Sequence, residues 1–255
     1  MLKSYKFSIK VYDAREEMGR NAAEEAGETL RKFIREKKEV NCIFAAAPSQ
    51  NEFLKYLVLQ EVEWSKVNVF HMDEYIGLEK GDVRSFSSFL IEKIFGKFHF
   101  KSVNTINGDA KNINREIERY SNLLNTFPVD ITFMGIGENG HIAFNDPHIA
   151  NFHDVELMKI VDLDLKCRMQ QVHDGCFQDI DQVPKYAVTL TIPALMRAEK
   201  VFCVVPSETK AEAVKNTIMG EISVKCPATI MRRHFDSTLF LDNDSAKFIV
   251  DEIIR

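Results

Sequence analysis

Short runs of β-branched and aromatic residues alternate along this chain with longer stretches in which apolar residues recur at helical spacing. The runs predict strands over residues 40–46, 67–72, 129–135, 187–192, 200–205 and 238–241. The stretches between them predict helices over residues 13–38, 49–62, 85–95, 112–124, 207–219 and 245–254. Because the strands are apolar at nearly every position, we expect both faces of their sheet to be buried. The pattern therefore predicts an α/β fold with a mainly parallel sheet and helices on both faces.

Nothing in the sequence divides the chain into parts. It shows no internal repeat, no low-complexity stretch and no linker rich in proline, glycine or serine. Its 255 residues fit one α/β domain, which we expect to span residues 1–255. Residues 148–182 are less regular and polar, which is more typical of a lid or an insertion than of an ordinary connection.

Charge and composition argue against several classes of protein. The 33 lysines and arginines are scattered among 38 acidic residues, for a net charge of −5, so we expect no nucleic-acid partner. No apolar run approaches the length of a membrane span, and the N-terminus lacks the apolar stretch of a signal peptide. The five cysteines include no C-x-x-C pair. We therefore expect a cytoplasmic protein with no membrane association, no disulfide framework and no zinc site.

The first candidate for chemistry follows the second predicted strand. Ligands of open parallel sheets bind beyond the carboxyl ends of the strands. If residues 71–75 are extended, His71, Asp73 and Tyr75 share one face, and Met72 and Glu74 share the other. A carboxylate in a half-desolvated crevice is a plausible general base, because burial raises its proton affinity. The alternative is that Asp73 only caps the next turn.

A glycine-rich segment follows the third predicted strand. Residues 135–140 match G-x-G-x-x-G, but a dinucleotide-binding site also requires a helix here, and Pro147 would stop one within about two turns. The glycines fit a tight turn that brings Asn139, His141 and Asp146 together. Histidine beside a carboxylate is typical of proton transfer near neutral pH, although a lone loop histidine is more often structural. We expect no cofactor and no metal.

Two further segments start helices after strands. Ser207 is a candidate N-cap, which places Lys210 near the third helical position, where a cation opposes the helix dipole. A bound anion such as phosphate would explain that lysine, and a solvated surface lysine is the alternative. Ser49 and Glu52 form a regular S-x-x-E capping box, and the Ser49 hydroxyl could contribute to the same phosphate site.

Three motifs then carry a resemblance to a known family. They are Met-Asp-Glu-Tyr-Ile-Gly-Leu at residues 72–78, the glycine-histidine segment at residues 135–147, and Gln-Val-Pro-Lys-Tyr-Ala at residues 182–187. Together with Ser207 and Lys210, they make the sequence resemble the glucosamine-6-phosphate deaminase (isomerase) family, whose fold is shared by the 6-phosphogluconolactonases. The resemblance implies a single-domain, Rossmann-like α/β fold, no redox cofactor, a small sugar phosphate as ligand, and a possible homo-oligomer.

The resemblance also implies roles in converting an amino-sugar 6-phosphate and water to a ketose 6-phosphate and ammonia. Asp73 would be the base that moves a proton from C2 to C1. His141, supported by Asn139 and Asp146, would assist opening of the sugar ring. Residue 146 is Asp where many members have Glu, and residue 139 is Asn where some have Asp.

The phosphate ligands follow the family less closely. The resemblance makes Lys210 and Ser49 phosphate ligands, and Arg168 is a candidate for the arginine that the family supplies to the phosphate. The loop at residues 45–49 reads Ala-Ala-Ala-Pro-Ser, without the glycines that commonly cradle the phosphate there.

Two other functions stay open on the sequence. A lactonase of the same fold would need the histidine as a base but would have little use for Asp73. A non-catalytic sugar-phosphate sensor is the second alternative. The sequence does not distinguish a gluco from a galacto substrate.

Overall fold

The main sheet of the computed structural model, which describes residues 5–249, contains seven strands that all run parallel. In spatial order they are β1 (Phe7–Tyr12), β10 (Ser237–Asp242), β9 (Lys200–Val205), β6 (Ile131–Met134), β2 (Val40–Phe44), β3 (Val67–His71) and β5 (Ser102–Asn104). Five of the six predicted strands are confirmed here. The strands β1 and β5 were not predicted, because their alternating or short patterns lack a continuous apolar run.

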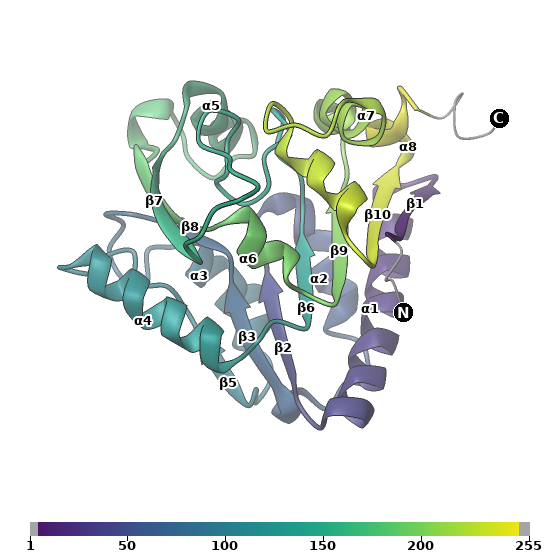
Figure 1. The fold of residues 1–255 in the computed structure, drawn as a ribbon, viewed down its shortest axis with the longest axis horizontal. Coiled ribbons are helices and arrows are strands. Elements are labelled where there is room, and N and C mark those ends of the chain that lie inside the picture. The colour runs from purple at the N-terminus through teal and green to yellow at the C-terminus, as the bar shows by residue number, and fades with distance from the viewer. Residues whose placement is uncertain (1–4, 250–255) are drawn as a thin grey trace.

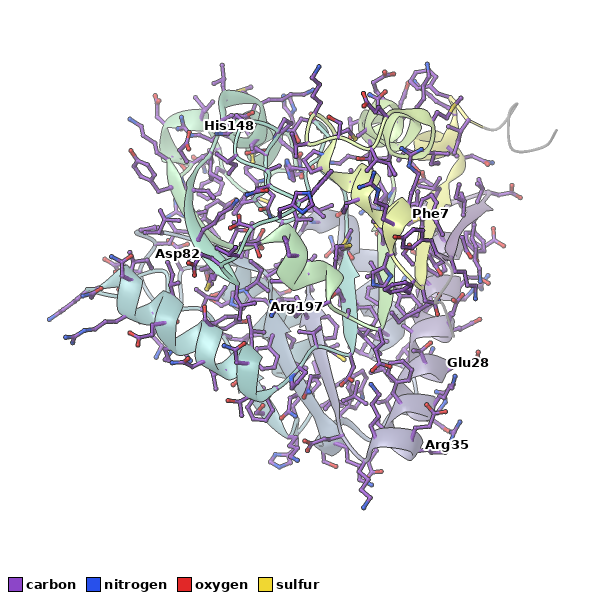
Figure 2. All side chains as sticks on the ribbon, viewed as in Figure 1. Phe7, Glu28, Arg35, Asp82, His148 and Arg197 are labelled. Carbon is purple, nitrogen blue, oxygen red and sulfur yellow. The ribbon has the colours of Figure 1, made fainter. Side chains whose placement is uncertain are left out.

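Helices cover both faces of this sheet, as predicted (Figure 1). One face packs against α1 (Arg15–Lys37) and α2 (Asn51–Leu57). The other packs against α4 (Ile113–Thr126), α6 (Ile192–Met196) and α7 (Ala211–Met219). Successive strand residues point to opposite faces, so Phe202 joins the first core and Cys203 the second. Outward side chains such as Glu28 and Arg35 of α1 are exposed (Figure 2).

A row of phenylalanines runs across the first face of the sheet. Phe44, Phe133, Phe202 and Phe240 come from the four adjacent strands β2, β6, β9 and β10, and their ring centroids follow one another at 4.8, 5.4 and 5.9 Å. All four rings are 1% exposed or less. Burial of a phenylalanine side chain stabilises a fold by about 1.5–3 kcal/mol, so this row is a large part of what holds the sheet to α1 and α2.

A second, antiparallel sheet lies beside the first and contains β4 (Asp73–Tyr75), β8 (Tyr186–Leu190) and β7 (Met158–Asp162). The strand predicted at residues 187–192 is β8, so its assignment to the parallel sheet was wrong, because an apolar run does not reveal which sheet it joins. The irregular segment at residues 148–182 holds β7 and α5 (Leu165–His173).

The remaining predicted helices are shorter than expected. Residues 85–95 form α3 (Phe86–Leu90) followed by a π-helical turn at Ile91–Phe95. The predicted C-terminal helix corresponds to α8 (Asn243–Ala246), and residues 250–254 of it lie outside the described residues. Neither difference changes the sheet that positions the site.

The strand order places a topological switch between β2 and β6. From β2 the chain adds β3 and β5 on one side, and from β6 it adds β9 and β10 on the other, where β10 pairs with β1, the first strand of the chain. The loops that leave the carboxyl ends of these two central strands therefore diverge and open a crevice. They are residues 45–50 and 135–146.

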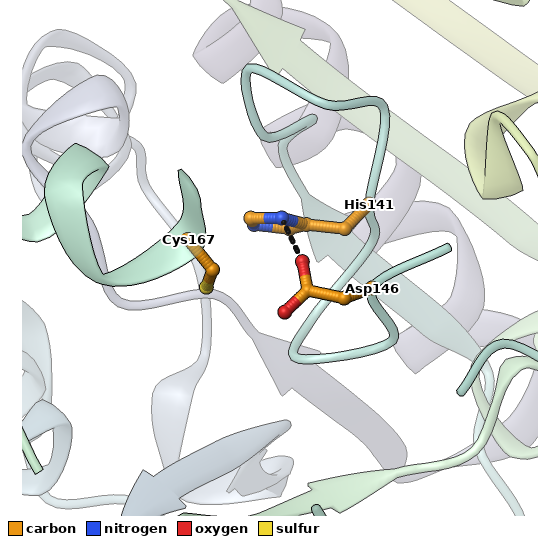
Figure 3. Close-up of side chains that lie close together, drawn as sticks. All are labelled: His141, Asp146 and Cys167. Carbon is orange, nitrogen blue, oxygen red and sulfur yellow. Dashed lines mark ion pairs between the residues drawn. The ribbon is translucent and has the colours of Figure 1, made fainter. Parts of the chain in front are cut away.

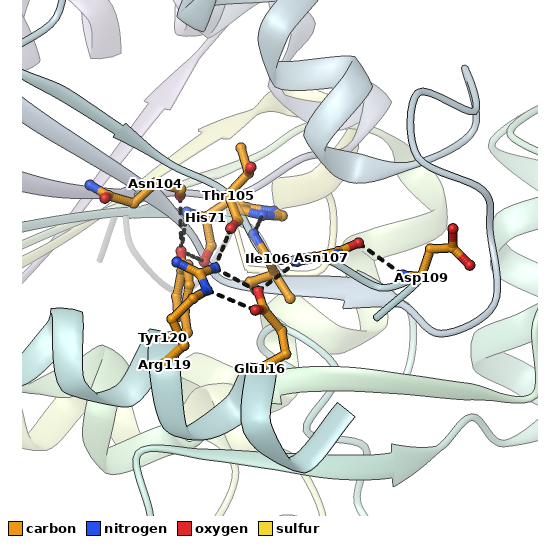
Figure 4. Close-up of polar contacts among 9 residues, drawn as sticks. All are labelled: His71, Asn104, Thr105, Ile106, Asn107, Asp109, Glu116, Arg119 and Tyr120. Carbon is orange, nitrogen blue, oxygen red and sulfur yellow. Dashed lines mark hydrogen bonds and ion pairs between the residues drawn. The ribbon is translucent and has the colours of Figure 1, made fainter. Parts of the chain in front are cut away.

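A buried polar network fixes the end of β3, where the chain turns toward the second sheet (Figure 4). The Tyr120 hydroxyl of α4 accepts the His71 backbone N–H at 2.9 Å and donates to the His71 carbonyl at 2.8 Å. The Ile106 N–H donates to Nε2 of His71 at 2.7 Å, so this imidazole is held neutral with its proton on Nδ1. Burial lowers the pKa of His71 to about 3.

This histidine makes the fold sensitive to acid. Its folded pKa of about 3 lies below the 6.5 of a free imidazole, so the unfolded chain binds more protons between those pH values. Stability is therefore present above pH 6.5 and is lost as the pH falls. By pH 4 the loss from His71 alone amounts to ~3 kcal/mol.

We expect His71→Gln, which can still accept the Ile106 N–H but does not titrate, to lose less stability on acidification than the wild type. Urea unfolding at pH 7 and pH 4 measures the difference, and the variant should lose ~3 kcal/mol less. Equal losses in the two proteins would contradict this account of His71.

Candidate active site

The crevice at the switch point contains a pocket whose walls come from both sheets. The β2 and β6 loops, the start of β4, helix α5 and the turn before α7 all contribute. Its lining residues are Ala45, Ala46, Ala47, Ser49, Gln50, Met72, Asp73, Phe86, Gly135, Ile136, Gly137, His141, Ala143, Phe144, Gln170, Gln171 and Lys210. Four of the seven residues proposed for the site from the sequence line this pocket, and two more, Asn139 and Asp146, contact the pocket residue His141.

Asp73 lies on the pocket wall at the junction of the two sheets, and it is 6% exposed. Burial and the neighbouring charge of Glu74 raise the pKa of Asp73 well above its usual value, and a hydrogen bond from the Phe144 backbone offsets only part of this. A carboxylate in this condition is a strong base when it is ionised.

The neighbouring carboxylate points away from the pocket. Glu74 accepts hydrogen bonds from the backbone N–H groups of Tyr75, Phe86 and Ser87 at 2.8–3.0 Å, so it caps α3. The predicted alternation is thus right for Asp73 and Glu74. It was wrong for His71, because the chain changes sheets at Met72 and His71 faces the α4 network instead.

His141, Asp146 and Asn139 form one hydrogen-bonded group (Figure 3 shows the first two). Nδ1 of His141 lies 2.9 Å from Oδ1 of Asp146, which also accepts from Nδ2 of Asn139 at 2.8 Å. The Asn139 side-chain oxygen accepts the His141 backbone N–H at 3.0 Å. Asp146 is fully buried, which alone would raise its pKa, but His141 and Asn139 outweigh burial and lower the pKa of Asp146.

Two glycines shape the turn that presents this histidine. A side chain at Gly137 would lie 2.2 Å from Nε2 of His141, so only glycine lets the imidazole pack over this backbone. Gly140 has φ +85°, a conformation that other residues rarely adopt. The predicted tight turn is confirmed, and Asp146 is where the chain leaves it.

Lys210 reaches the pocket from the turn after β9 and is 3% exposed. Burial lowers the pKa of Lys210, and the charges of Asp174 and Glu138 act in the opposite direction. Ser207 precedes the turn with φ 88° and ψ 141°, a strained backbone held by hydrogen bonds from its N–H to both carboxylate oxygens of Asp242 at 3.0 and 3.2 Å. Ser207 occupies the predicted N-cap position before Glu208–Lys210, but its side chain makes no capping hydrogen bond.

Ser49 lines the pocket, but the predicted capping box was wrong. Residues Pro48–Gln50 form a 3₁₀ turn that begins after Ala47, and α2 begins only at Asn51. The Ser49 hydroxyl accepts from Nε2 of Gln50 at 3.2 Å, and Glu52 pairs with Arg15 at 2.7 Å. The proline at position 48 starts the helical turn earlier than a regular capping box requires.

Arg168 is not part of the pocket wall. Its guanidinium donates to the backbone carbonyls of Ile180 and Val183 and so ties α5 to the segment that leads into β8. The structure therefore does not bring Arg168 to the pocket with Lys210 and Ser49, where an arginine for the phosphate was expected.

Two glutamines of α5 lie on the pocket wall and were missed by the sequence analysis. Gln170 and Gln171 are each 6% exposed. Uncharged amides in an irregular segment carry no motif, and only the placement of α5 against the β6 loop brings them to the site.

One group near the pocket has donor atoms suited to a metal ion. Nitrogen of His141, oxygen of Asp146 and sulfur of Cys167 lie within 4.8 Å of one another (Figure 3). Burial raises the pKa of the Cys167 thiol, so it is a neutral side chain here and not a ready-made thiolate ligand. That the reaction uses no metal stays a prediction.

Within residues 5–249, none of the helices combines the length and the hydropathy needed to cross a membrane.

Comparison with known proteins identifies the family. Residues 13–240 match the model of the glucosamine-6-phosphate isomerases/6-phosphogluconolactonase family. The chain belongs to this family. Within it, the chain is 35% identical over 212 residues to a glucosamine-6-phosphate deaminase of Listeria monocytogenes, a match that covers 83% of this chain and 88% of that protein. It is 33% identical to a glucosamine-6-phosphate deaminase of Bacillus cereus, covering 76% and 72%.

Solved structures of the family agree with this fold. A monomeric glucosamine-6-phosphate deaminase superposes with a TM-score of 0.85 at 26% identity, covering 94% of this chain and 99% of that one. A 6-phosphogluconolactonase from Shewanella baltica superposes with a TM-score of 0.77 at 12% identity, covering 93% and 98%, which shows the shared fold. The Rossmann-like α/β architecture expected from the resemblance is confirmed.

We expect Lys210→Met to abolish stabilisation by inorganic phosphate. Ligand binding to the folded state raises Tm, and the wild type should therefore show a phosphate-dependent shift that the variant lacks. Without phosphate the variant should be at least as stable, because it removes a desolvated ammonium. Thermal unfolding with and without phosphate measures both effects, with the exposed Lys225→Met as the control. A shift of equal size in wild type and Lys210→Met would contradict a phosphate site at this lysine.

Proposed function

We propose that this chain is an amino-sugar-phosphate deaminase/isomerase, acting in the cytoplasm on glucosamine 6-phosphate or an epimer. The observation that carries the proposal is that one pocket joins a buried carboxylate, a histidine–carboxylate pair and a buried lysine. The named relatives support it, because the chain spans most of the length of two glucosamine-6-phosphate deaminases at 33% and 35% identity.

Ring opening is the step that suits His141. The imidazole takes the proton of the C1 hydroxyl and returns one to the ring oxygen, which breaks the C1–O5 bond and yields the open-chain aldehyde. Asp146 contacts Nδ1, so it fixes the tautomer and leaves Nε2 for the sugar, and Asn139 holds the carboxylate in place. Asn139 and Asp146 are therefore positioning residues in this proposal.

Proton transfer between carbons suits Asp73. The carboxylate removes the C2 proton, and the electron pair forms a C1–C2 double bond while O1 takes up a proton, which gives an enol that bears the amino group. The proton from C2 is then delivered to C1, and the nitrogen gives up a proton in place of the one that O1 gained as the C2–N bond becomes a ketimine. The resulting ketimine at C2 then takes up water and releases ammonia, which leaves the ketose 6-phosphate. Burial supports this role, since it gives Asp73 the high proton affinity that abstraction beside a carbonyl requires.

In this proposal Lys210 and Ser49 bind the 6-phosphate. Lys210 provides the positive charge, and the Ser49 hydroxyl lies at the helical turn that follows β2. All these groups come from a single chain, so the proposed reaction does not depend on assembly into a homo-oligomer. One structural relative is itself described as a monomeric deaminase.

Purified protein should release ammonia and form fructose 6-phosphate from glucosamine 6-phosphate. Coupled assays for both products measure the reaction, and the galactosamine epimer is tested in parallel. Failure to turn over either amino sugar would contradict the proposal and favour a sugar-phosphate sensor, which would bind in a calorimetric titration without reaction.

Asp73→Asn separates this function from the lactonase alternative. Loss of the base should lower kcat for deamination by about 10²- to 10⁴-fold. Hydrolysis of a 6-phosphosugar lactone needs the histidine and should not change. If kcat for deamination in Asp73→Asn stays within tenfold of the wild-type value while lactone hydrolysis is fast, the result favours the lactonase function.

The same variant provides its own folding control. Because the folded pKa of Asp73 is raised, the ionised carboxylate destabilises the fold as the pH rises above its usual value. Asparagine lacks this charge and can accept the same hydrogen bond from Phe144. Asp73→Asn should therefore have a Tm at pH 7 that equals or exceeds that of the wild type.

A further inference from the structure

Gln171 of α5 brings an unpaired hydrogen-bond donor into the pocket. The residue lines the pocket wall and is 6% exposed. Its side-chain oxygen accepts a hydrogen bond from the Tyr75 hydroxyl at 2.6 Å. Among the hydrogen bonds of residues 5–249, the one to Tyr75 is the only one made by the Gln171 side chain, so its amide nitrogen has no protein acceptor there.

Tyr75 determines which way this amide faces. Its ring is fully buried and packs against Phe86, Phe144 and Phe177 at centroid distances of 4.7–5.4 Å. A buried phenol needs an acceptor for its proton, and the Gln171 oxygen is the acceptor at hand. The amide nitrogen, on the other side of the same carbon, must therefore point away from Tyr75.

In the neighbouring Gln170, both the oxygen and the nitrogen of the side-chain amide make hydrogen bonds within the protein. The Gln170 oxygen accepts the Glu138 backbone N–H at 2.9 Å, and its nitrogen donates to Oδ2 of Asp174 at 3.3 Å. Both ends of Gln170 are occupied by the protein. Gln170 is therefore a matched control of the same type, burial and helix.

We propose that the amide N–H of Gln171 donates a hydrogen bond to a hydroxyl oxygen of the sugar, which makes α5 a specificity-determining element. This inference rests on the proposed function and adds a substrate contact to it. A sugar that fills the pocket displaces the water around this N–H, and a donor that loses its water without a new acceptor is costly. Sugar hydroxyls provide that acceptor.

The position of Gln171 favours a hydroxyl over the phosphate as its acceptor. Its partner Tyr75 lies two residues after Asp73 on β4, so the two side chains leave the strand on the same face. Asp73 acts at C2, so a group on its side of the pocket faces the neighbouring hydroxyls at C3 and C4. The phosphate is bound at Lys210.

The test compares glucosamine 6-phosphate with its 3-deoxy and 4-deoxy analogues, in the wild type and in Gln171→Met, Gln171→Glu and Gln170→Met. In the wild type, removal of the contacted hydroxyl should lower kcat/KM at least about fivefold. In both Gln171 variants that penalty should shrink to within twofold, since the donor is gone. Gln171→Glu keeps an acceptor for Tyr75, so it remains informative if the methionine variant does not fold.

The control variant distinguishes contact from mere structural support. Gln170→Met should keep the full penalty even if its kcat falls, because a structural defect affects the parent sugar and its analogues alike. A penalty that survives in the Gln171 variants, or is absent in the wild type for both analogues, overturns the inference. If the wild type releases no ammonia, the proposed function fails, and dissociation constants of the same three sugar phosphates from calorimetry decide the inference in its place.

Discussion

The structure depends on a change of sheet at a single residue. β3 ends at His71 in the parallel sheet, and β4 begins at Asp73 in the antiparallel one, with the Leu190 N–H bonded to the Met72 carbonyl at 2.8 Å. This junction removes Asp73 from solvent and places it at the wall of the crevice at the switch point. Hydrogen bonds with Tyr120 and Ile106 hold His71, the last residue of β3. The fold thus holds a carboxylate where it is costly for stability and useful for chemistry.

Two aspartates of one site have their proton affinities moved in opposite directions. Asp73 receives little beyond one backbone hydrogen bond, so burial dominates and its pKa rises. Asp146 is also buried, but it receives the imidazole of His141 and the amide of Asn139, so its pKa falls. Opposite pKa shifts let two residues of the same type take different roles in one site. One carboxylate can exchange a proton with the substrate, and the other remains an anion that orients a histidine.

Much of this could be predicted from the sequence, because continuous apolar runs reveal buried parallel strands and strand ends reveal the crevice. Asp73, His141 and Lys210 were found in this way. Ser49 lines the pocket as expected, but it does not cap a helix as the S-x-x-E pattern predicted. The pattern does not show that Pro48 starts a 3₁₀ turn before the helix begins. Arg168 and Gln171 lie in the irregular segment before β8, where no periodicity fixes which side chain faces the pocket. Only the packing of α5 against Tyr75 and the β6 loop decides that.

The central claim is that the buried Asp73 carboxylate is the base of the reaction. The most direct measurement is kcat against pH at saturating glucosamine 6-phosphate, where kcat reports groups in the bound complex. Since burial raises the pKa of Asp73 and only the ionised form accepts a proton, kcat should fall on acidification with a midpoint well above 3.8. A kcat that stays constant down to pH 4 in folded protein would contradict the account.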